Sequence, residues 1–235
     1  MSQSENNRIF AFEIFFSTTI FMNLQLTKLH SEFNTLQLTH WEKSLNSVYG
    51  AGAISKPKIC LMFMNPTARN ISCSPDWQWI RAPRVWFKQT RKMMYDLWFI
   101  SDDIYAKTQW SSTQRSPSFV NELYTHLAEK WIFITNLAKC TQSDAKQLPD
   151  STFKAYIPSI YTELTLLQPQ HIITFWNQVS SILLAKKVNV SSYENNMHEI
   201  LEIENTSYKV YPCRYPVGMW YRNIDKAKAR IQAII

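Results

Sequence analysis

The chain has 235 residues, of which 46% are hydrophobic and 18% charged, so it can bury a full core, and its composition excludes a disordered or low-complexity protein. Lys and Arg number 25 against 18 Asp and Glu, and the net charge of +7 favours polyanionic partners without choosing among them. The four cysteines lie far apart without a C-x-x-C pair, which excludes a zinc ribbon and a disulfide framework and indicates reduced thiols in the cytoplasm.

The chain is predicted to form one domain over residues 1–235, and residues 1–50 are predicted to be a helical extension packed on it. The apolar run 9–22 is interrupted by Glu13 and three hydroxyl residues, and no basic segment or small-residue cleavage site accompanies it. We therefore expect a buried or amphipathic segment rather than a membrane anchor. A helical pattern follows over 24–46, and the glycines at 50 and 52 indicate a connector.

Short apolar runs then alternate with helical patterns. Four runs have the continuous apolar character of strands buried on both faces, namely 58–64, 131–136, 171–175 and 208–212. Helices are predicted over 87–97, 116–130, 149–169, 177–187 and 223–235. Pro158 is expected to kink the third of these helices or divide it in two. This order predicts an α/β fold, with three α/β/α layers around a central, mainly parallel four-stranded sheet.

The loops that follow the four strands are the expected ligand site, because ligands of such sheets bind at the carboxyl ends of the strands. Asn65, Asn136 and Asn177 each stand at or near the end of a strand. The first of these loops, "MNPTARN", begins with Asn-Pro and contains no glycine, so it does not have the composition of a phosphate-binding loop. Each Asn could instead simply cap a helix or form a turn.

Taken together, the loops resemble those of the uracil-DNA glycosylase superfamily, from about Lys58 to the C-terminus. "FMNPT" is similar to the first motif of the mismatch-specific and single-strand-selective branches. "WIFITNLAKC", with the helix and strand that follow it, is similar to the iron-sulfur branch of bacteria and archaea. "YPVGMWYRN" stands where the superfamily has its second motif, usually His-Pro-Ser followed by a wedge loop.

The resemblance implies base excision from DNA, in which a nucleotide is flipped out of the stack and water attacks its sugar. It implies that Asn65 positions this water and that Asn136 holds the edge of the base, since one amide offers both a donor and an acceptor. Met64 and one aromatic residue, Trp86 or Phe87, are the expected remaining base contacts. An amide can also turn to face a cytosine-like edge, so Asn136 alone does not determine the base.

The fourth loop departs from the superfamily at its catalytic donor. Tyr215 occupies the position of the usual His, and it either donates to the base in place of the imidazole or belongs to a reassigned loop. Met219 and Trp220 are the expected wedge that fills the gap in the DNA, although Trp220 could instead pack against the last helix. The predicted DNA contacts comprise Arg69, Arg84, Lys139, Arg214, Met219, Trp220 and Arg222.

Two further departures concern the cofactor and the substrate. Only Cys140 falls at a ligand position of the iron-sulfur branch, so we expect no cluster, no metal and no other cofactor. The segment 76–92, rich in Trp and Arg, stands where the iron-sulfur branch has a glycine-rich loop that stacks the base. The excised base could therefore be uracil or a modified cytosine, such as glucosylated hydroxymethylcytosine of phage DNA. Repair and defence against phage are therefore both open as roles.

The predicted protein is a cytoplasmic, monomeric and monofunctional DNA glycosylase that leaves an abasic site and has no membrane partner. Monofunctional action is expected because the matched loops carry no Lys at the usual place of a Schiff-base nucleophile. One alternative is a non-catalytic module of similar fold that recognises flipped or abasic nucleotides. Another is an unrelated doubly wound enzyme that acts on a nucleotide, which the missing glycine-rich phosphate loop disfavours.

Overall fold

A computed structural model describes residues 24–39, 41–84, 88–110, 116–144, 146–216 and 223–235. The strands are β1 (Ala51–Gly52), β2 (Ile59–Phe63), β3 (Ile132–Asn136), β4 (His171–Phe175), β5 (Glu199–Ile203) and β6 (Thr206–Cys213). The helices are a helix over 24–39, α2 (Lys88–Asp96), α3 (Asp102–Lys107), α4 (Pro117–Glu129), α5 (Asp150–Leu167), α6 (Asn177–Leu183) and α7 (Asn223–Gln232). Two 3-10 turns, η1 (Ile71–Cys73) and η3 (Val190–Ser192), lie in loops.

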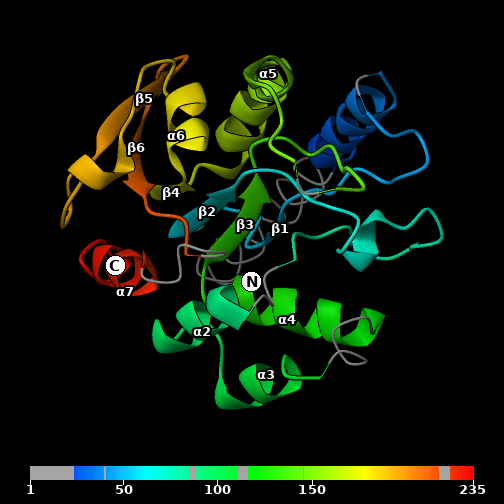
Figure 1. Cartoon of the computed structure of the whole chain (residues 1–235), viewed down its shortest axis with the longest axis horizontal. Coiled ribbons are helices and arrows are strands. Elements are labelled where there is room, and N and C mark those ends of the chain that lie inside the picture. The colour runs from blue at the N-terminus through cyan, green and yellow to red at the C-terminus, as the bar shows by residue number, and fades with distance from the viewer. Residues whose placement is uncertain (1–23, 40, 85–87, 111–115, 145, 217–222) are drawn as a thin grey trace, which may run out of the picture.

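The strands form one six-stranded sheet in the order β1-β3-β2-β4-β6-β5 (Figure 1). The four central strands run parallel, and the edge strands β1 and β5 are antiparallel to their neighbours. An α/β fold with a mainly parallel sheet is therefore confirmed. The sheet is larger than the four strands predicted from the sequence: all four are present at its centre, and each edge carries one more.

Of the two glycines that suggested a connector, Gly52 belongs to the edge strand β1 and Gly50 directly precedes that strand. Gly52 has a φ of 114°, and a Cβ atom there would lie 2.1 Å from the backbone oxygen of Ile132. At Gly50 a Cβ atom would lie 2.2 Å from the Phe133 ring. Glycine is needed here because β1 and the residue before it lie directly against β3, a close approach that a side chain would prevent.

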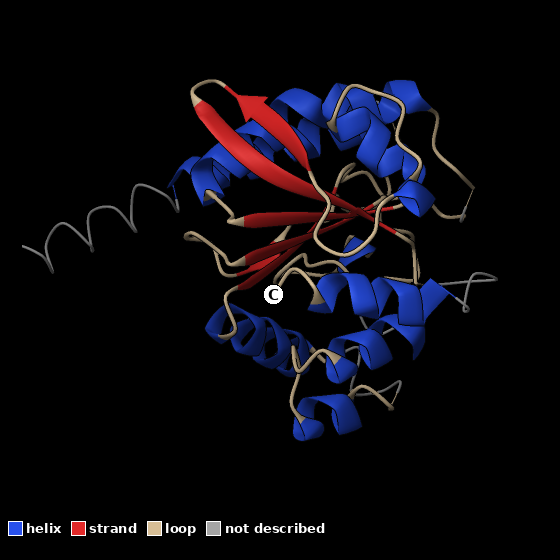
Figure 2. Ribbon diagram, turned by 90° about the vertical axis from the view of Figure 1, so that its left-hand side faces the viewer, coloured by secondary structure: helices blue, strands red, loops and turns tan. Residues whose placement is uncertain are grey.

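Helices cover both faces of the sheet (Figure 2). Helices α2, α3, α4 and α7 enclose one core with inward residues such as Leu61 and Ile134. The helix over 24–39 packs with α5 and α6 on the other face, where Leu29 and Phe33 belong to the same core as the strand residues Cys60 and Ile172. Strand residues alternate between the two cores, which is why β2, β3 and β4 consist mostly of apolar residues without an alternation of apolar and polar positions.

Helix α5 continues through Pro158 without a break, so the proline does not divide this helix in two. Pro158 is exposed, and the helix buries residues on both sides of it, including Phe153, Ile160 and Leu164. Packing of this apolar face against the sheet outweighs the one backbone hydrogen bond that proline removes. None of the described helices is long and apolar enough to cross a membrane.

Candidate active site

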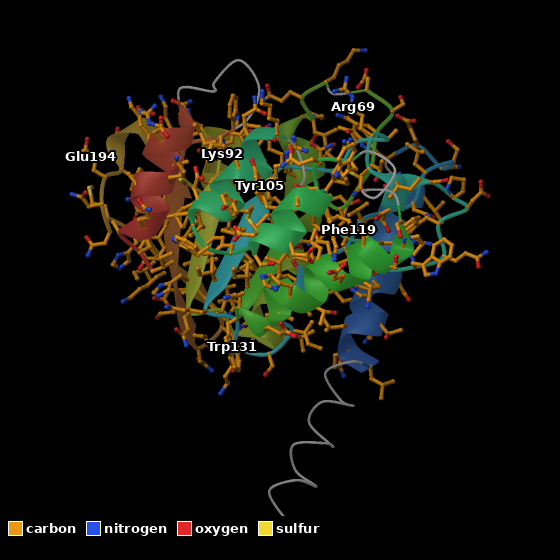
Figure 3. The ribbon with its side chains drawn as sticks, turned by 90° about the horizontal axis from the view of Figure 1, so that it is seen from below. Arg69, Lys92, Tyr105, Phe119, Trp131 and Glu194 are labelled. Atoms are coloured by element: carbon orange, nitrogen blue, oxygen red, sulfur yellow. The ribbon has the colours of Figure 1, made fainter. Side chains whose placement is uncertain are left out.

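Strands β2, β3, β4 and β6 are parallel, so the loops that follow them all leave the sheet where these strands end. We call this side of the sheet its carboxyl edge, as distinct from the outer strands β1 and β5. Arg69, in the loop after β2, lies at the opposite end of the molecule from Trp131, which immediately precedes β3 (Figure 3). The sequence-predicted residues at the ends of the strands therefore share one side of the protein.

The first two loops run side by side beyond the sheet. Phe63 and Asn136 are partners in the β2–β3 register, and the pairing continues outward until the Ala68 amide donates to the Gln142 carbonyl at 2.9 Å. Asn65 lies within this paired stretch. The structure thus places Asn65, two residues beyond the end of β2, close to Asn136, the last residue of the neighbouring strand β3.

Asn136 is a buried amide with an unpaired donor. Its side chain is only 4% exposed, and its Nδ2 atom has no hydrogen-bond partner among the described residues. Burying an amide N–H without a partner costs about 1–3 kcal/mol, so this arrangement is unfavourable in the free protein. A bound carbonyl oxygen would satisfy the donor, which makes Asn136 a candidate ligand-binding residue on structural grounds alone.

Asn65 is partly buried, and its Nδ2 atom donates to the carbonyl of Pro66 at 3.0 Å. This local bond holds the amide close to its own turn. Asn70, five residues further on, has a purely structural geometry: its Nδ2 donates to the Ala82 carbonyl at 2.8 Å, and its Oδ1 accepts from the Ser72 amide at 3.2 Å. The two asparagines of this loop therefore differ in their hydrogen bonding. Both polar side-chain atoms of Asn70 bond to the backbone, whereas within the described chain the Asn65 side chain bonds only from its Nδ2 atom to Pro66.

Aromatic rings fill the space between the strand ends. Phe63 stacks on Phe175 with ring centroids 4.6 Å apart, and Tyr215 packs edge-on against Trp176 at 5.8 Å and Phe63 at 6.5 Å. Burial raises the pKa of the Tyr215 phenol, so the hydroxyl is protonated at neutral pH and can act as a hydrogen-bond donor. Tyr215 therefore lies at the predicted edge, held by an aromatic cluster.

Trp176 is a residue of this cluster that sequence reasoning missed. Its backbone has φ 92° and ψ 148°, a region that non-glycine residues rarely adopt. The Trp176 amide donates to the Cys213 carbonyl at 3.0 Å, which ties the start of α6 to the end of β6. The only signal in the sequence is an aromatic residue directly after a buried strand. The neighbouring Asn177 accepts from the Val190 amide at 2.9 Å and has a structural role.

Lys139 corrects one predicted DNA contact. Its side chain is fully buried, its Nζ atom lies 2.8 Å from Glu163 of α5 and also donates to Thr135, and it lies 5.0 Å from the centre of the Phe33 ring. Burial lowers the pKa of the Lys139 ammonium, and the Glu163 carboxylate opposes that shift. An internal ion pair of this kind cannot contact a DNA phosphate, so the prediction for Lys139 is wrong.

The remaining predicted DNA contacts differ in how accessible they are. Arg69 is exposed, and Arg84 is partly buried with one guanidinium nitrogen 2.8 Å from the Arg69 carbonyl, so Arg84 also supports the loop. Arg214 is partly buried beside a pocket. Other residues assigned from the sequence lie outside the described part of the chain: Trp86, Phe87, Met219, Trp220 and Arg222.

The cysteines are dispersed through the interior. Cys60, Cys73, Cys140 and Cys213 are all buried free thiols, and burial raises the pKa of the last three to about 12. Across the described ranges, no three His, Cys, Asp or Glu residues are grouped in a way that could hold a metal ion.

Neither models of known protein families nor the sequences of curated proteins give a match to this chain. The function is therefore inferred from the geometry at the carboxyl edge of the sheet.

Proposed function

We propose that the protein is a DNA glycosylase of the uracil-DNA glycosylase type, which hydrolyses the N-glycosidic bond of a flipped-out pyrimidine. The observation that carries the proposal is the unpaired, buried amide of Asn136 beside the Asn65 loop. A flipped base presents carbonyl and N–H groups along one edge, and these complement an amide that is held in place without a protein partner. The parallel strands, with helices on both faces of the sheet, place this amide where α/β proteins bind ligands.

In the proposed reaction, Asn136 holds the base edge and Met64 is a further contact of the base. Asn65 orients a water molecule whose oxygen bonds to the sugar C1′ as the bond from C1′ to the base nitrogen breaks. The departing base takes the bonding electrons, and a hydrogen bond from the protonated Tyr215 phenol stabilises its developing negative charge. The water that has bonded to C1′ loses a proton to the solvent, and the base anion takes up a proton in turn, so the products are the neutral free base and an abasic site.

The proposal includes monofunctional action, without a covalent enzyme–DNA intermediate. A Schiff base requires an accessible, uncharged amine. Lys139, the lysine nearest to the end of β3, is fully buried and paired with Glu163, so its amine cannot reach a sugar. We propose a reaction without a metal or other cofactor, carried out by a cytoplasmic monomer on DNA.

The proposed substrate class is uracil or a modified cytosine. Trp79 is 56% exposed, and its ring packs edge-on against buried Trp77 with centroids 5.0 Å apart. An exposed indole fixed by a buried one, in the long loop that follows β2, offers a flat surface on which a sugar or a base can stack. This favours a substrate with a bulky group, such as glucosylated hydroxymethylcytosine of phage DNA, and with it a role in defence rather than repair.

The test is direct detection of released bases by mass spectrometry. Uracil-containing DNA, unmodified DNA and glucosylated phage DNA are incubated with the wild-type protein and with three variants. Asn65→Ala is expected to slow base release by about 10²-fold or more, because the attacking water is no longer oriented. Asn65→Asp is expected to retain or increase the rate, because a carboxylate both orients and deprotonates water.

Asn177→Ala is the matched control. Asn177 also follows a central strand, but it is exposed and its Oδ1 atom bonds to the Val190 amide. We expect this variant to release bases at the wild-type rate. Equal rates for Asn65→Ala and the wild-type protein on a verified substrate would refute the role given to Asn65.

A second candidate function is a binding module that recognises a flipped or abasic nucleotide without cutting the glycosidic bond. The packing of the Tyr215 ring against Trp176 and Phe63 favours it, because a ring held in an aromatic cluster also fits a purely structural role. This candidate predicts tight, salt-dependent DNA binding with no base released from any of the three substrates.

A further inference from the structure

A pocket of about 280 Å³ lies beside the proposed active site, between α7 and the segment that leads into β5. Its lining includes Ser191, Glu194 and Asn195 from that segment, Arg214 from the end of β6, and Lys226 and Arg230 from α7. Strand β5 runs antiparallel to β6, so residues 190–198 lie at the carboxyl end of β6. Glu194 and Arg69 both lie in the half of the molecule opposite Trp131 (Figure 3). The pocket thus extends the active edge of the sheet.

The pocket is positively charged and partly rigid. Three of its lining side chains are cationic and one, Glu194, is anionic. Arg230 is only 6% exposed, and its guanidinium donates to the backbone carbonyls of Pro212 at 2.8 Å, Asn195 at 2.5 Å and Met197. These acceptors carry no net charge, so within the described chain its positive charge is fixed at the pocket wall without a carboxylate partner.

Arg214 connects the pocket to the active site. Cys213 and Tyr215, the residues on either side of it, both pack into the core that faces α7 and α2. Arg214 lines the pocket instead. A ligand in the pocket therefore lies next to the chain segment that holds the Tyr215 ring.

We propose that this pocket binds a backbone phosphate of the DNA strand that carries the flipped nucleotide. Arg214 and Lys226 are the phosphate ligands, the Ser191 and Asn195 side chains are polar neighbours, and Arg230 supplies a fixed positive charge. The inference rests on the proposed function for the identity of the strand. An anchored phosphate beside Tyr215 would fix the position of the backbone while the base turns into the site.

The test measures how the affinity for a single-stranded oligodeoxynucleotide without modified bases depends on salt. Lys226→Gln and Arg214→Gln are compared with Lys130→Gln, which removes an exposed lysine at the opposite edge of the sheet. Each pocket variant is expected to reduce the slope of log K against log salt by about 0.7, the value for one phosphate contact on a single strand. We expect the dissociation constant at low salt to rise about 3- to 10-fold, and the Lys130→Gln slope to equal that of the wild type.

The outcomes separate this inference from the proposed function. Base release combined with unchanged slopes for both pocket variants overturns the phosphate pocket and leaves the glycosylase proposal standing. Reduced slopes without any base release support phosphate binding in the pocket and overturn the proposed glycosylase activity. Titration with inorganic phosphate, followed by NMR, is the third arm: if phosphate shifts the signals of 190–195 while both slopes stay unchanged, the pocket binds free phosphate, and the strand contact is wrong.

Discussion

At the scale of single residues, Asn136 and Asn70 are both buried asparagines with opposite relations to their surroundings. Asn136 has an unpaired Nδ2 atom within the described chain, whereas both polar atoms of Asn70 are hydrogen-bonded. Asn136→Ala removes an unsatisfied donor, so we expect the free energy of unfolding to change by less than about 1 kcal/mol or to increase. Base release should fall by at least about 10²-fold in the same variant.

The matched variant is Asn70→Ala, which leaves the Ser72 amide and the Ala82 carbonyl without their partner. We expect it to lower the free energy of unfolding by about 1–3 kcal/mol, measured by urea denaturation alongside Asn136→Ala. If both variants lose the same stability, Asn136 is an ordinary structural asparagine, and the observation that carries the proposed function is removed.

His30 provides a prediction about pH. Its ring stacks on Tyr49 with centroids 3.9 Å apart, and burial, assisted by the nearby charges of Lys139 and Arg81, lowers its pKa to about 4. The unfolded chain, with a His pKa near 6.5, binds this proton more readily, so the free energy of unfolding falls as the pH falls from about 6.5 to about 4.

The variant His30→Phe keeps a stacked ring and removes the titration. Between pH 6.5 and pH 4 the free energy of unfolding of this variant is expected to fall less than that of the wild type. The difference between the two falls should be about 1–3 kcal/mol. Urea denaturation at a series of pH values gives both curves, and their difference isolates His30 from the other titrating groups. Parallel curves over this range would show that His30 keeps its ordinary pKa in the folded protein.

At the scale of elements, the buried pair of Lys139 and Glu163 joins the loop after β3 to α5. Lys139→Met leaves the Glu163 carboxylate buried without its cation, and we expect this to lower the free energy of unfolding by about 3–5 kcal/mol. The double variant Lys139→Met with Glu163→Gln should recover most of this loss, because the amide is neutral and can still accept from Thr135. Denaturant unfolding of the two single variants and the double variant measures the coupling, and additive losses would contradict it.

The central strands β2, β3 and β4 could be predicted from the sequence because each is a short, mostly apolar run buried on both faces, and β6 because its second half is buried in the same way. The edge strands could not be predicted in the same way. β1 has two residues, and its glycines serve the approach to β3, a contact that the sequence does not show. β5 alternates exposed and buried residues over only five positions, and it follows a long polar segment.

The candidate site was predictable to a similar degree. Asn65, Asn136 and Tyr215 could be placed at one edge because the parallel direction of the strands follows from the alternation of strands and helices. The burial of Lys139 depends on Glu163, which is 24 residues away on a helix, and a lysine after a strand end gives no sign of such a partner. The positive φ of Trp176 likewise has no signature in its residue type.

At the scale of the whole molecule, charge alone does not locate the proposed DNA surface. Exposed lysines at positions 56, 58 and 130 surround the amino-terminal edge of the sheet, while Arg69 and the pocket cations lie at the other edge. A net charge of +7 would attract DNA to either end. The unpaired amide of Asn136 and the cationic pocket select the carboxyl edge.

Hydrogen–deuterium exchange with and without a single-stranded oligodeoxynucleotide tests this choice of edge. DNA that threads along the carboxyl edge excludes water from the loops there, so we expect slower exchange in segments 63–69, 137–142 and 190–196. Segments 54–58 and 129–131, at the other edge, should exchange at unchanged rates despite their exposed lysines. The measurement should be made at two salt concentrations, because nonspecific attraction to the lysines weakens as salt increases. Protection that moves to 54–58 and 129–131, or that spreads equally over both ends, would place the DNA on the wrong side for Asn136 and contradict the proposed site.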